Sequence, residues 1–176
     1  MIYLERNDLL IRDLCEADIE PIVAGEIAQG WLGASREKYD MRLRDAAEGR
    51  CAALCAVLQG RPAGYINVYF KAYPPYAETA WPEIVDFGVL EIYRNRGIGT
   101  ALMDAAEALA AKRSDTVCLG VGLHSGYGAA QRMYVKRGYI PDGTGVWYQG
   151  KPLGQYAPCV NDDDLNLYFT KKLRCD

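Results

Sequence analysis

The sequence predicts one domain of the mixed α+β class, spanning residues 1–176. Three observations favour this domain organisation and fold class. A length of 176 residues suits a single domain with a sizeable core. Strand-like patterns occur towards both ends of the chain, and helical patterns lie between them. The sequence has no repeats, low-complexity tracts or obvious linker, so nothing in it marks a second domain.

A strand and two helices are expected at the start of the chain. Segment 9–15 has a strand-like alternation, and Glu16 opens an acidic first helical turn. Ser35 is placed to cap a second helix, which runs to Glu48 and ends at Gly49. The apolar residues of the first helix recur at helical spacing: Ile19, Ile22, Val23 and Ile27.

Three strands are expected in the middle of the chain. Segments 51–58 and 63–73 are apolar, and they flank a turn at 59–62 that contains glycine and proline. Segment 73–82 is rich in proline, so it is expected to be a loop, because proline cannot serve in a central strand. Segment 83–90, EIVDFGVL, is the third strand.

Two helices and three strands complete the prediction. Apolar residues form one helical stripe over 98–112, and segment 116–121 alternates as a strand does. A helix over 128–138 ends at a glycine. The tail, 138–173, opens as a strand, becomes a loop rich in glycine and proline, and ends in a strand over 165–173 that is free to pair across subunits in a homodimer.

Composition and charge exclude several classes of protein. Hydrophobic residues make up 50% and charged residues 24%, as in ordinary globular domains. The net charge of −3 argues against a dedicated nucleic-acid binder, which carries a basic patch. Charges interrupt the first residues, unlike in a signal peptide, and no apolar run approaches the roughly 20 residues of a membrane span. A cytoplasmic protein without nucleic acid or membrane as partner is expected.

The cysteines and the single histidine do not form a metal-binding pattern. The six cysteines contain no C-x-x-C pair, and Cys51 and Cys55 are interpreted as small buried side chains of one strand. His124 is far from any clustered ligands. The sequence therefore predicts no metal cofactor.

The segment 94–100, RNRGIGT, places two glycines where a helix begins. The first N–H groups of a helix have no intrahelical partner and carry the positive end of its dipole, so they bind anions, phosphate above all. Gly97 and Gly99 leave room for a bulky diphosphate. A Walker loop needs a lysine before Thr100, and a dinucleotide fingerprint needs a third glycine where Leu102 stands. The segment predicts a phosphate cradle of another kind.

Two motifs in order resemble the GCN5-related N-acetyltransferases. Segment 87–103, FGVLEIYRNRGIGTALM, is similar to the acetyl-CoA motif of that family, and segment 130–139 is similar to its A-x-x-x-Y-x-x-x-G-F/Y motif. The strong resemblance covers roughly residues 84–140, and 9–18 is similar to the family's first strand and helix. The resemblance implies a central, mostly antiparallel, twisted sheet of six to seven strands with about four helices. It also implies acetyl transfer from acetyl-CoA to a primary amine.

The resemblance implies how the coenzyme is held. Strand 83–90 is expected to bulge or splay near its end, so that the Val89 N–H faces the thioester carbonyl, with pantetheine between this strand and 116–121. The diphosphate is expected on the N–H groups that open the helix at 98–112. The expected cofactor-binding residues are Val89, Arg94, Asn95, Arg96, Gly97, Ile98, Gly99, Thr100 and Tyr134.

Three residues are expected to be catalytic. Tyr134 matches the family's tyrosine near the coenzyme sulfur, and a phenol, with its ordinary pKa near about 10, is a suitable proton donor to a thiolate. Glu83 and Asp86 are the candidate general bases. They lie three apart, so they point to opposite faces if the strand is regular. Asp86 is nearer to Val89, and the choice between the two carboxylates stays open.

Other residues near the motifs have alternative roles. Tyr127 stands where the family often has an asparagine that contacts pantetheine, and Glu91 stands where proline is usual. His124 is either a solvated loop residue or an aid to proton transfer. Cys118 is the one cysteine near the motifs, but its strand position indicates burial. Direct attack in a ternary complex is therefore expected, rather than a covalent intermediate.

The acceptor is expected to be a small-molecule amine. The aromatic residues that are candidates for the wall of its pocket are Trp31, Tyr39, Trp147, Tyr148 and Tyr156. The acidic run 162–164 is interpreted as a solvated turn. An open groove would instead favour a protein N-terminus or lysine as acceptor. A non-catalytic CoA-binding sensor domain, or an interaction protein with a vestigial site, are the alternatives from other classes.

Overall fold

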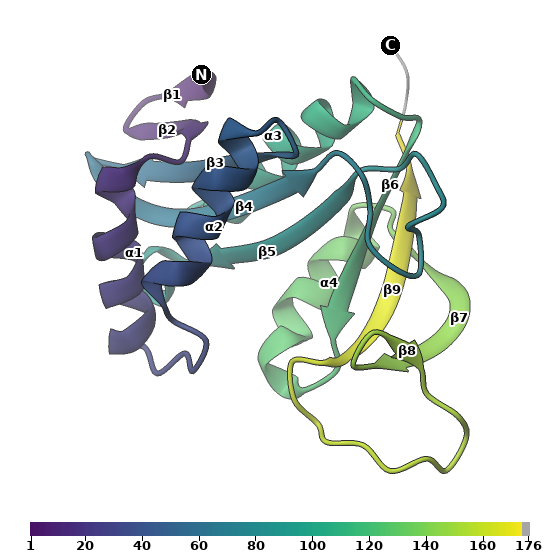
Figure 1. The fold of residues 1–176 in the computed structure, drawn as a ribbon. Coiled ribbons are helices and arrows are strands. Elements are labelled where there is room, and N and C mark those ends of the chain that lie inside the picture. Colours follow the sequence, from purple (N-terminus) through teal and green to yellow (C-terminus); the bar gives the residue numbers. More distant parts are fainter. Residues whose placement is uncertain (174–176) are drawn as a thin grey trace. The chain divides into compact units, whose positions relative to one another are not determined.

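The computed structural model describes residues 1–173, which form two compact units. The N-terminal unit contains residues 1–70 and 84–109, and the C-terminal unit contains residues 71–83 and the chain from residue 110 onward. Figure 1 shows the elements of both units. Glu83 begins a strand whose other residues belong to the N-terminal unit.

The described residues contain four α-helices, two short 3₁₀ segments and nine strands. The elements that lie wholly or mainly in the N-terminal unit are β1 (Ile2–Arg6), β2 (Leu9–Asp13), α1 (Glu16–Ala28), α2 (Arg36–Ala47), β3 (Cys51–Leu58), β4 (Arg61–Tyr69), β5 (Glu83–Val89), η1 (Glu91–Tyr93) and α3 (Ile98–Ala111). Those of the C-terminal unit are β6 (Thr116–Gly122), η2 (Ser125–Tyr127), α4 (Gly128–Lys136), β7 (Ile140–Tyr148), β8 (Lys151–Pro152) and β9 (Leu165–Lys172).

The sheet of the N-terminal unit has the order β1-β2-β3-β4-β5, and its first three pairs are antiparallel. Helices α1 and α2 cover one face and α3 the other (Figure 1). Two neighbouring residues of β4 point to opposite faces of this sheet, because side chains alternate along a strand. Tyr65 packs into the core that α1 and α2 share with the sheet, whereas Gly64 approaches Leu102 of α3.

The starts of α1 and α2 agree with the sequence prediction. Ser35 accepts the Lys38 N–H at 3.4 Å and caps α2 as expected. At α1 the cap is Cys15, whose N–H donates to the Asp18 carboxylate at 2.9 Å. The buried Asp18 carboxylate also accepts two hydrogen bonds from Arg12 of β2. Each cap satisfies N–H groups that the helix itself leaves free.

The C-terminal unit has the strand order β6-β9-β7-β8, and these pairs are antiparallel. Strand β9 lies between β6 and β7: Phe169 is paired with Leu119 on one side and with Pro141 on the other. Both edges of β9 are therefore occupied within the chain. The expectation that strand 165–173 pairs across subunits is wrong, and a homodimer by any other surface stays a prediction.

The mixed fold with four α-helices and mostly antiparallel strands is confirmed, but six to seven strands was too low a count. The additional strands are β1, whose five residues include two charges, and β8, which has two residues. Neither is long or apolar enough to show a strand pattern. Within residues 1–173, no helix has the length and apolarity that crossing a membrane requires. A single domain over 1–176 stays a prediction.

Candidate active site

The glycine turn forms the N-terminus of α3. The first helical hydrogen bond is from the Ala101 N–H to the Gly97 oxygen, at 3.0 Å. The N–H groups of Ile98, Gly99 and Thr100 precede that bond, so the helix offers them no carbonyl. Gly97 is exposed, and its side-chain position has open space around it. These features fit the diphosphate of coenzyme A, because amides and the helix dipole point at an accessible surface.

The two glycines are required for different physical reasons. Gly97 has φ of +77°, a conformation that strains other residues, and Asn95 before it has φ of +61°. Gly99 has no such backbone need. A β-carbon on Gly99 would lie 3.2 Å from the Phe87 ring and 3.7 Å from a methyl of Val89, so this glycine lets α3 pack closely on β5. The sequence prediction gave both glycines one role, room for the diphosphate.

Arg94 is not a free cation beside the turn. Its guanidinium pairs with Glu91 at 3.0 Å and lies 5.9 Å from the centre of the Trp31 ring. Gln29 accepts the Glu91 N–H at 2.8 Å. The segment between α1 and α2 therefore contacts the turn, which sequence reasoning missed. Trp31 stacks with Arg94 instead of standing among the predicted pocket aromatics.

Strand β5 is irregular at Asp86, whose φ is +56°. The Asn67 side chain of β4 donates to the oxygens of Val85 and Asp86, at 3.4 and 3.3 Å. Further along, the Leu90 N–H donates to the Ala63 oxygen at 3.0 Å. Successive N–H groups of a strand point to opposite edges, so the Val89 N–H points away from β4. The expected departure from regular strand geometry is thus present, three residues before Val89.

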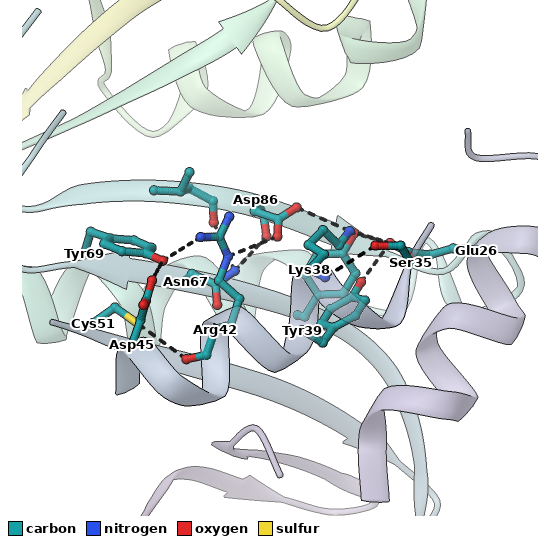
Figure 2. A network of polar contacts seen from close by, with 12 residues as sticks. Glu26, Ser35, Lys38, Tyr39, Arg42, Asp45, Cys51, Asn67, Tyr69 and Asp86 are labelled. Carbon is teal, nitrogen blue, oxygen red and sulfur yellow. Dashed lines mark hydrogen bonds and ion pairs between the residues drawn. The ribbon is translucent and has the colours of Figure 1, made fainter. Parts of the chain in front are cut away.

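The Asp86 carboxylate lies between two cations of α2, as Figure 2 shows. Lys38 is 3.5 Å and Arg42 is 3.6 Å from its oxygens. Arg42 also donates to the Tyr69 hydroxyl at 2.5 Å. Both cations are largely buried. The charge of Asp86 is therefore already balanced by its neighbours, which argues against a free carboxylate waiting for a substrate proton.

The buried carboxylate of Glu26, on α1, completes this network (Figure 2). It accepts hydrogen bonds from the hydroxyls of Tyr39, at 2.8 Å, and Tyr65, and it pairs with Lys38 at 3.1 Å. Tyr39 is 1% exposed, so it does not wall an open pocket, and that prediction is wrong. The network joins α1, α2, β4 and β5 of the N-terminal unit.

Glu83 has a different environment, within the C-terminal unit. Its side chain is buried, and the Tyr73 N–H donates to one carboxylate oxygen at 2.8 Å. No residue among 1–173 forms an ion pair with it. Burial raises the pKa of Glu83 to about 7, against 4.5 ordinarily, because the charged form loses hydration; the Tyr73 hydrogen bond lowers it only partly. A pKa near neutrality suits a general base.

Aromatic rings gather in the same unit as Glu83. Tyr76 lies 5.4 Å from Trp81 and 5.9 Å from Tyr168, and Trp147 lies 5.5 Å from Tyr168, between ring centres. We call these four residues the aromatic cluster. Tyr76 is buried and the other three are partly buried. Of the five aromatic residues predicted for a pocket, Trp147 alone belongs to this cluster.

Tyr134 lies on α4 with its ring buried against Tyr139, at 5.7 Å between centres. Burial, with a smaller effect from Tyr127, raises the pKa of the Tyr134 hydroxyl above its ordinary value. The phenol is therefore protonated at neutral pH, as a proton donor must be. The thiol of Cys118 is also buried, and burial followed by the charge of Glu83 raises its pKa. Cys118 is consequently a poor nucleophile.

His124 takes part in a structural contact. Its Nδ1 accepts the Gly126 N–H at 3.1 Å, and its Nε2 is 3.0 Å from the Asp163 carboxylate. The Tyr127 hydroxyl donates to the same carboxylate at 2.9 Å. The hydrogen bond from His124 is the main cause that lowers the pKa of Asp163. Asp163 therefore ties the 162–164 turn to η2, and it is not merely solvated.

The predicted site residues fall into both units. The N-terminal unit holds Asp86 and the cofactor-binding set Val89, Arg94, Asn95, Arg96, Gly97, Ile98, Gly99 and Thr100. The C-terminal unit holds Glu83 and Tyr134. Tyr156 is 96% exposed and stands outside the aromatic cluster. Residues 76, 81 and 168 were missed, because their shared location depends on how the loop before β5 packs against β9, which no local pattern encodes.

A helix N-terminus opened by a glycine turn, after an interrupted strand in a mixed fold, is compatible with the coenzyme A-dependent acyltransferase that the sequence predicts, because such a terminus binds phosphate. The model of the Acetyltransferase (GNAT) family matches residues 19–139. The chain belongs to this family, and acetyl-CoA is its acetyl donor. A comparison with curated proteins gives no match.

Solved structures share the fold at low sequence identity. Ard1 from Thermoplasma volcanium has a TM-score of 0.70 and 20% identity, with 95% of this chain and 99% of that chain covered. The acetyltransferase from Salmonella typhimurium that modifies the N-terminal serine of ribosomal protein L7/L12 has a TM-score of 0.71 and 15% identity, covering 99% and 100%. A related RimL structure contains coenzyme A, at a TM-score of 0.71, 14% identity and full coverage of both chains.

Proposed function

We propose that the protein transfers the acetyl group of acetyl-CoA to the primary amine of a small molecule, by direct attack in a ternary complex. The observation that carries the proposal is Glu83, a buried carboxylate with a pKa of about 7 and no ion-pair partner among residues 1–173. Such a group is half ionised near neutral pH and can take a proton from an amine. Asp86 is already paired with Lys38 and Arg42.

The proposed reaction assigns one role to each group. The amine nitrogen gives one proton to Glu83 and attacks the thioester carbon. The Val89 N–H donates to the oxygen that becomes negative. The carbon–sulfur bond then breaks, and Tyr134 gives the thiolate a proton. The N–H groups that open α3 hold the diphosphate.

A protein α-amine is the second candidate acceptor. It is supported by the names of similar structures, since RimL acts on the N-terminus of a ribosomal protein and a Brucella melitensis structure is named ribosomal-protein-alanine N-acetyltransferase (21% identity, TM-score 0.64, covering 93% of this chain and 99% of that chain). A cytoplasmic location belongs to the same proposal, for either acceptor.

Isothermal titration with acetyl-CoA tests the cradle. Gly97→Glu places a carboxylate where the diphosphate is expected and should abolish binding. Gly150→Glu is the matched control, because Gly150 also has a positive φ, +72°, and open space around it. The parent and the Gly150 variant should bind alike. Equal binding by both glutamate variants would contradict a cradle at Gly97.

Release of free coenzyme A then distinguishes the acceptors. A panel of small amines and of N-terminal peptides is offered with acetyl-CoA to the parent and to Glu83→Gln. Turnover of small amines that falls about a hundredfold in the variant supports the proposal. Turnover of peptides alone favours the protein acceptor. Binding of acetyl-CoA without turnover of any amine would favour a sensor domain.

A further inference from the structure

The aromatic cluster combines features that the reaction above leaves unexplained. Its rings come from three separate parts of the C-terminal unit: Tyr76 and Trp81 from the loop before β5, Trp147 from β7 and Tyr168 from β9. The centres of neighbouring rings are 5.4–5.9 Å apart, and three of the four rings keep part of their surface exposed. Fully packed core aromatics would have no accessible surface left.

Glu83 follows Trp81 of the cluster by two residues, and the Pro82 oxygen between them accepts the Cys118 N–H at 3.1 Å and the Cys118 thiol at 3.4 Å. The charge of Glu83 raises the pKa of Tyr168 of the cluster, after the larger effect of burial. Cys118, which also interacts with Glu83, belongs to the same small core as Tyr76, with Trp81 and Tyr168 packed against it. A buried carboxylate without a cation is costly, and a ligand cation would compensate it.

The chemistry of both groups favours the same ligand. The faces of tryptophan and tyrosine rings attract ammonium ions, and a carboxylate attracts them more strongly. Rings that already meet edge to face also accept a further aromatic ring in that geometry. A carboxylate on the ligand would be repelled, because the carboxylates of Glu83 and Asp142 both act on Tyr168 of the cluster. Asp142 also accepts a hydrogen bond from the Tyr76 hydroxyl at 2.5 Å.

We propose that the aromatic cluster and Glu83 form the acceptor subsite, and that the acceptor is an arylalkylamine without a carboxylate beside its amine. This rests on the proposed function and names its substrate class. The amine arrives as an ammonium ion, passes one proton to Glu83 and attacks with the electron pair that this frees. As the carbon–sulfur bond breaks, Tyr134 protonates the thiolate, and the second proton that the nitrogen loses goes to the Tyr134 oxygen. The groups facing Glu83 are Tyr73, by its N–H, Cys118 of β6 and Tyr168 of β9.

Binding of the amine alone tests the subsite without acetyl-CoA. Isothermal titration compares phenethylamine with two relatives: cyclohexylethylamine, which lacks the aromatic ring, and phenylalanine, which adds a carboxylate. The parent should bind phenethylamine at least several-fold more tightly than either relative. Trp81→Leu and Tyr168→Leu should each raise its Kd about three- to tenfold. Tyr156→Leu is the matched control, because Tyr156 is 96% exposed and should leave the Kd unchanged.

Variants that keep an aromatic ring distinguish a weakened subsite from a loss of folding. Trp81→Phe and Tyr168→Phe keep an aromatic face and should bind phenethylamine within about twofold of the parent. Leucine variants that bind as the parent does, or equal affinity for all three amines, would overturn the subsite. Failure of the proposed function looks different: acetyl-CoA then fails to bind, or no amine is acetylated, whatever the amine titrations show.

Discussion

At the scale of single residues, Glu83 is expected to control the pH dependence of catalysis. Its pKa of about 7 means that the ionised form, which accepts the proton, is lost as the pH falls below 7. The rate constant kcat/KM should therefore fall tenfold for each pH unit below that value. In Glu83→Gln this acid limb should disappear together with most of the activity. An unchanged acid limb in the variant would assign the base to another group.

The same residue should make the protein less stable as the pH rises. The folded carboxyl keeps its proton up to about pH 7, whereas the unfolded one releases it near 4.5, so stability is highest below 4.5 and declines between these values. The difference corresponds to about 3 kcal/mol. Urea unfolding at pH 8 should thus find Glu83→Gln more stable than the parent. The exposed Glu78→Gln serves as control and should show no such gain.

Replacing Gly88 by a larger residue is expected to lower the stability of the fold, because Tyr65 occupies the space beside it. A β-carbon there would lie 2.8 Å from the tyrosine hydroxyl, which Glu26 and Lys38 hold in place. Gly88→Ala should cost about 1–3 kcal/mol in thermal or urea unfolding. In a Tyr65→Leu background the same change should cost clearly less. Equal costs in both backgrounds would mean that Tyr65 moves aside freely.

At the scale of elements, sequence patterns located most helices and strands but did not give their irregularities. The start of α3 was predicted correctly, because glycines at a helix N-terminus are a local signal. The face on which Asp86 lies was not predictable, because the argument assumed a regular strand and Asp86 has φ of +56°. The burial of Glu83 could not be predicted from the sequence either. It depends on packing within the C-terminal unit, which local periodicity does not report.

The contact between Asp163 and η2 should control the mobility of the loop before β9. Asp163→Ala removes the acceptor for His124 and Tyr127, so amide hydrogen exchange in residues 153–164 should increase about two- to tenfold. Asp164→Ala is the control, since Asp164 is exposed and its hydrogen bonds with Asp162 and Gln149 are made by its backbone. An equal increase in both variants would show that the 162–164 turn itself, and not the contact of Asp163 with η2, limits amide hydrogen exchange.

At the scale of the whole molecule, the fold class followed from the sequence, whereas the division into two compact units did not. The boundaries between the units cut through β5, after Glu83, and through α3, after Leu109. Because the chain passes from one unit to the other within β5 and within α3, unfolding of one unit should disrupt an element of the other. We therefore expect one cooperative transition in calorimetry, as for a single domain.

Acetyl-CoA should raise the temperature of that one transition. A ligand at a hundred times its Kd stabilises the folded state by about 2.7 kcal/mol, which is roughly 5–10 °C for a chain of this size. Calorimetry of the parent and of Gly150→Glu should show this shift, and Gly97→Glu should not. Two transitions, of which acetyl-CoA moves only one, would instead mean that the units unfold independently. The cradle would then stabilise its own unit alone, and the prediction of one domain over residues 1–176 would be wrong.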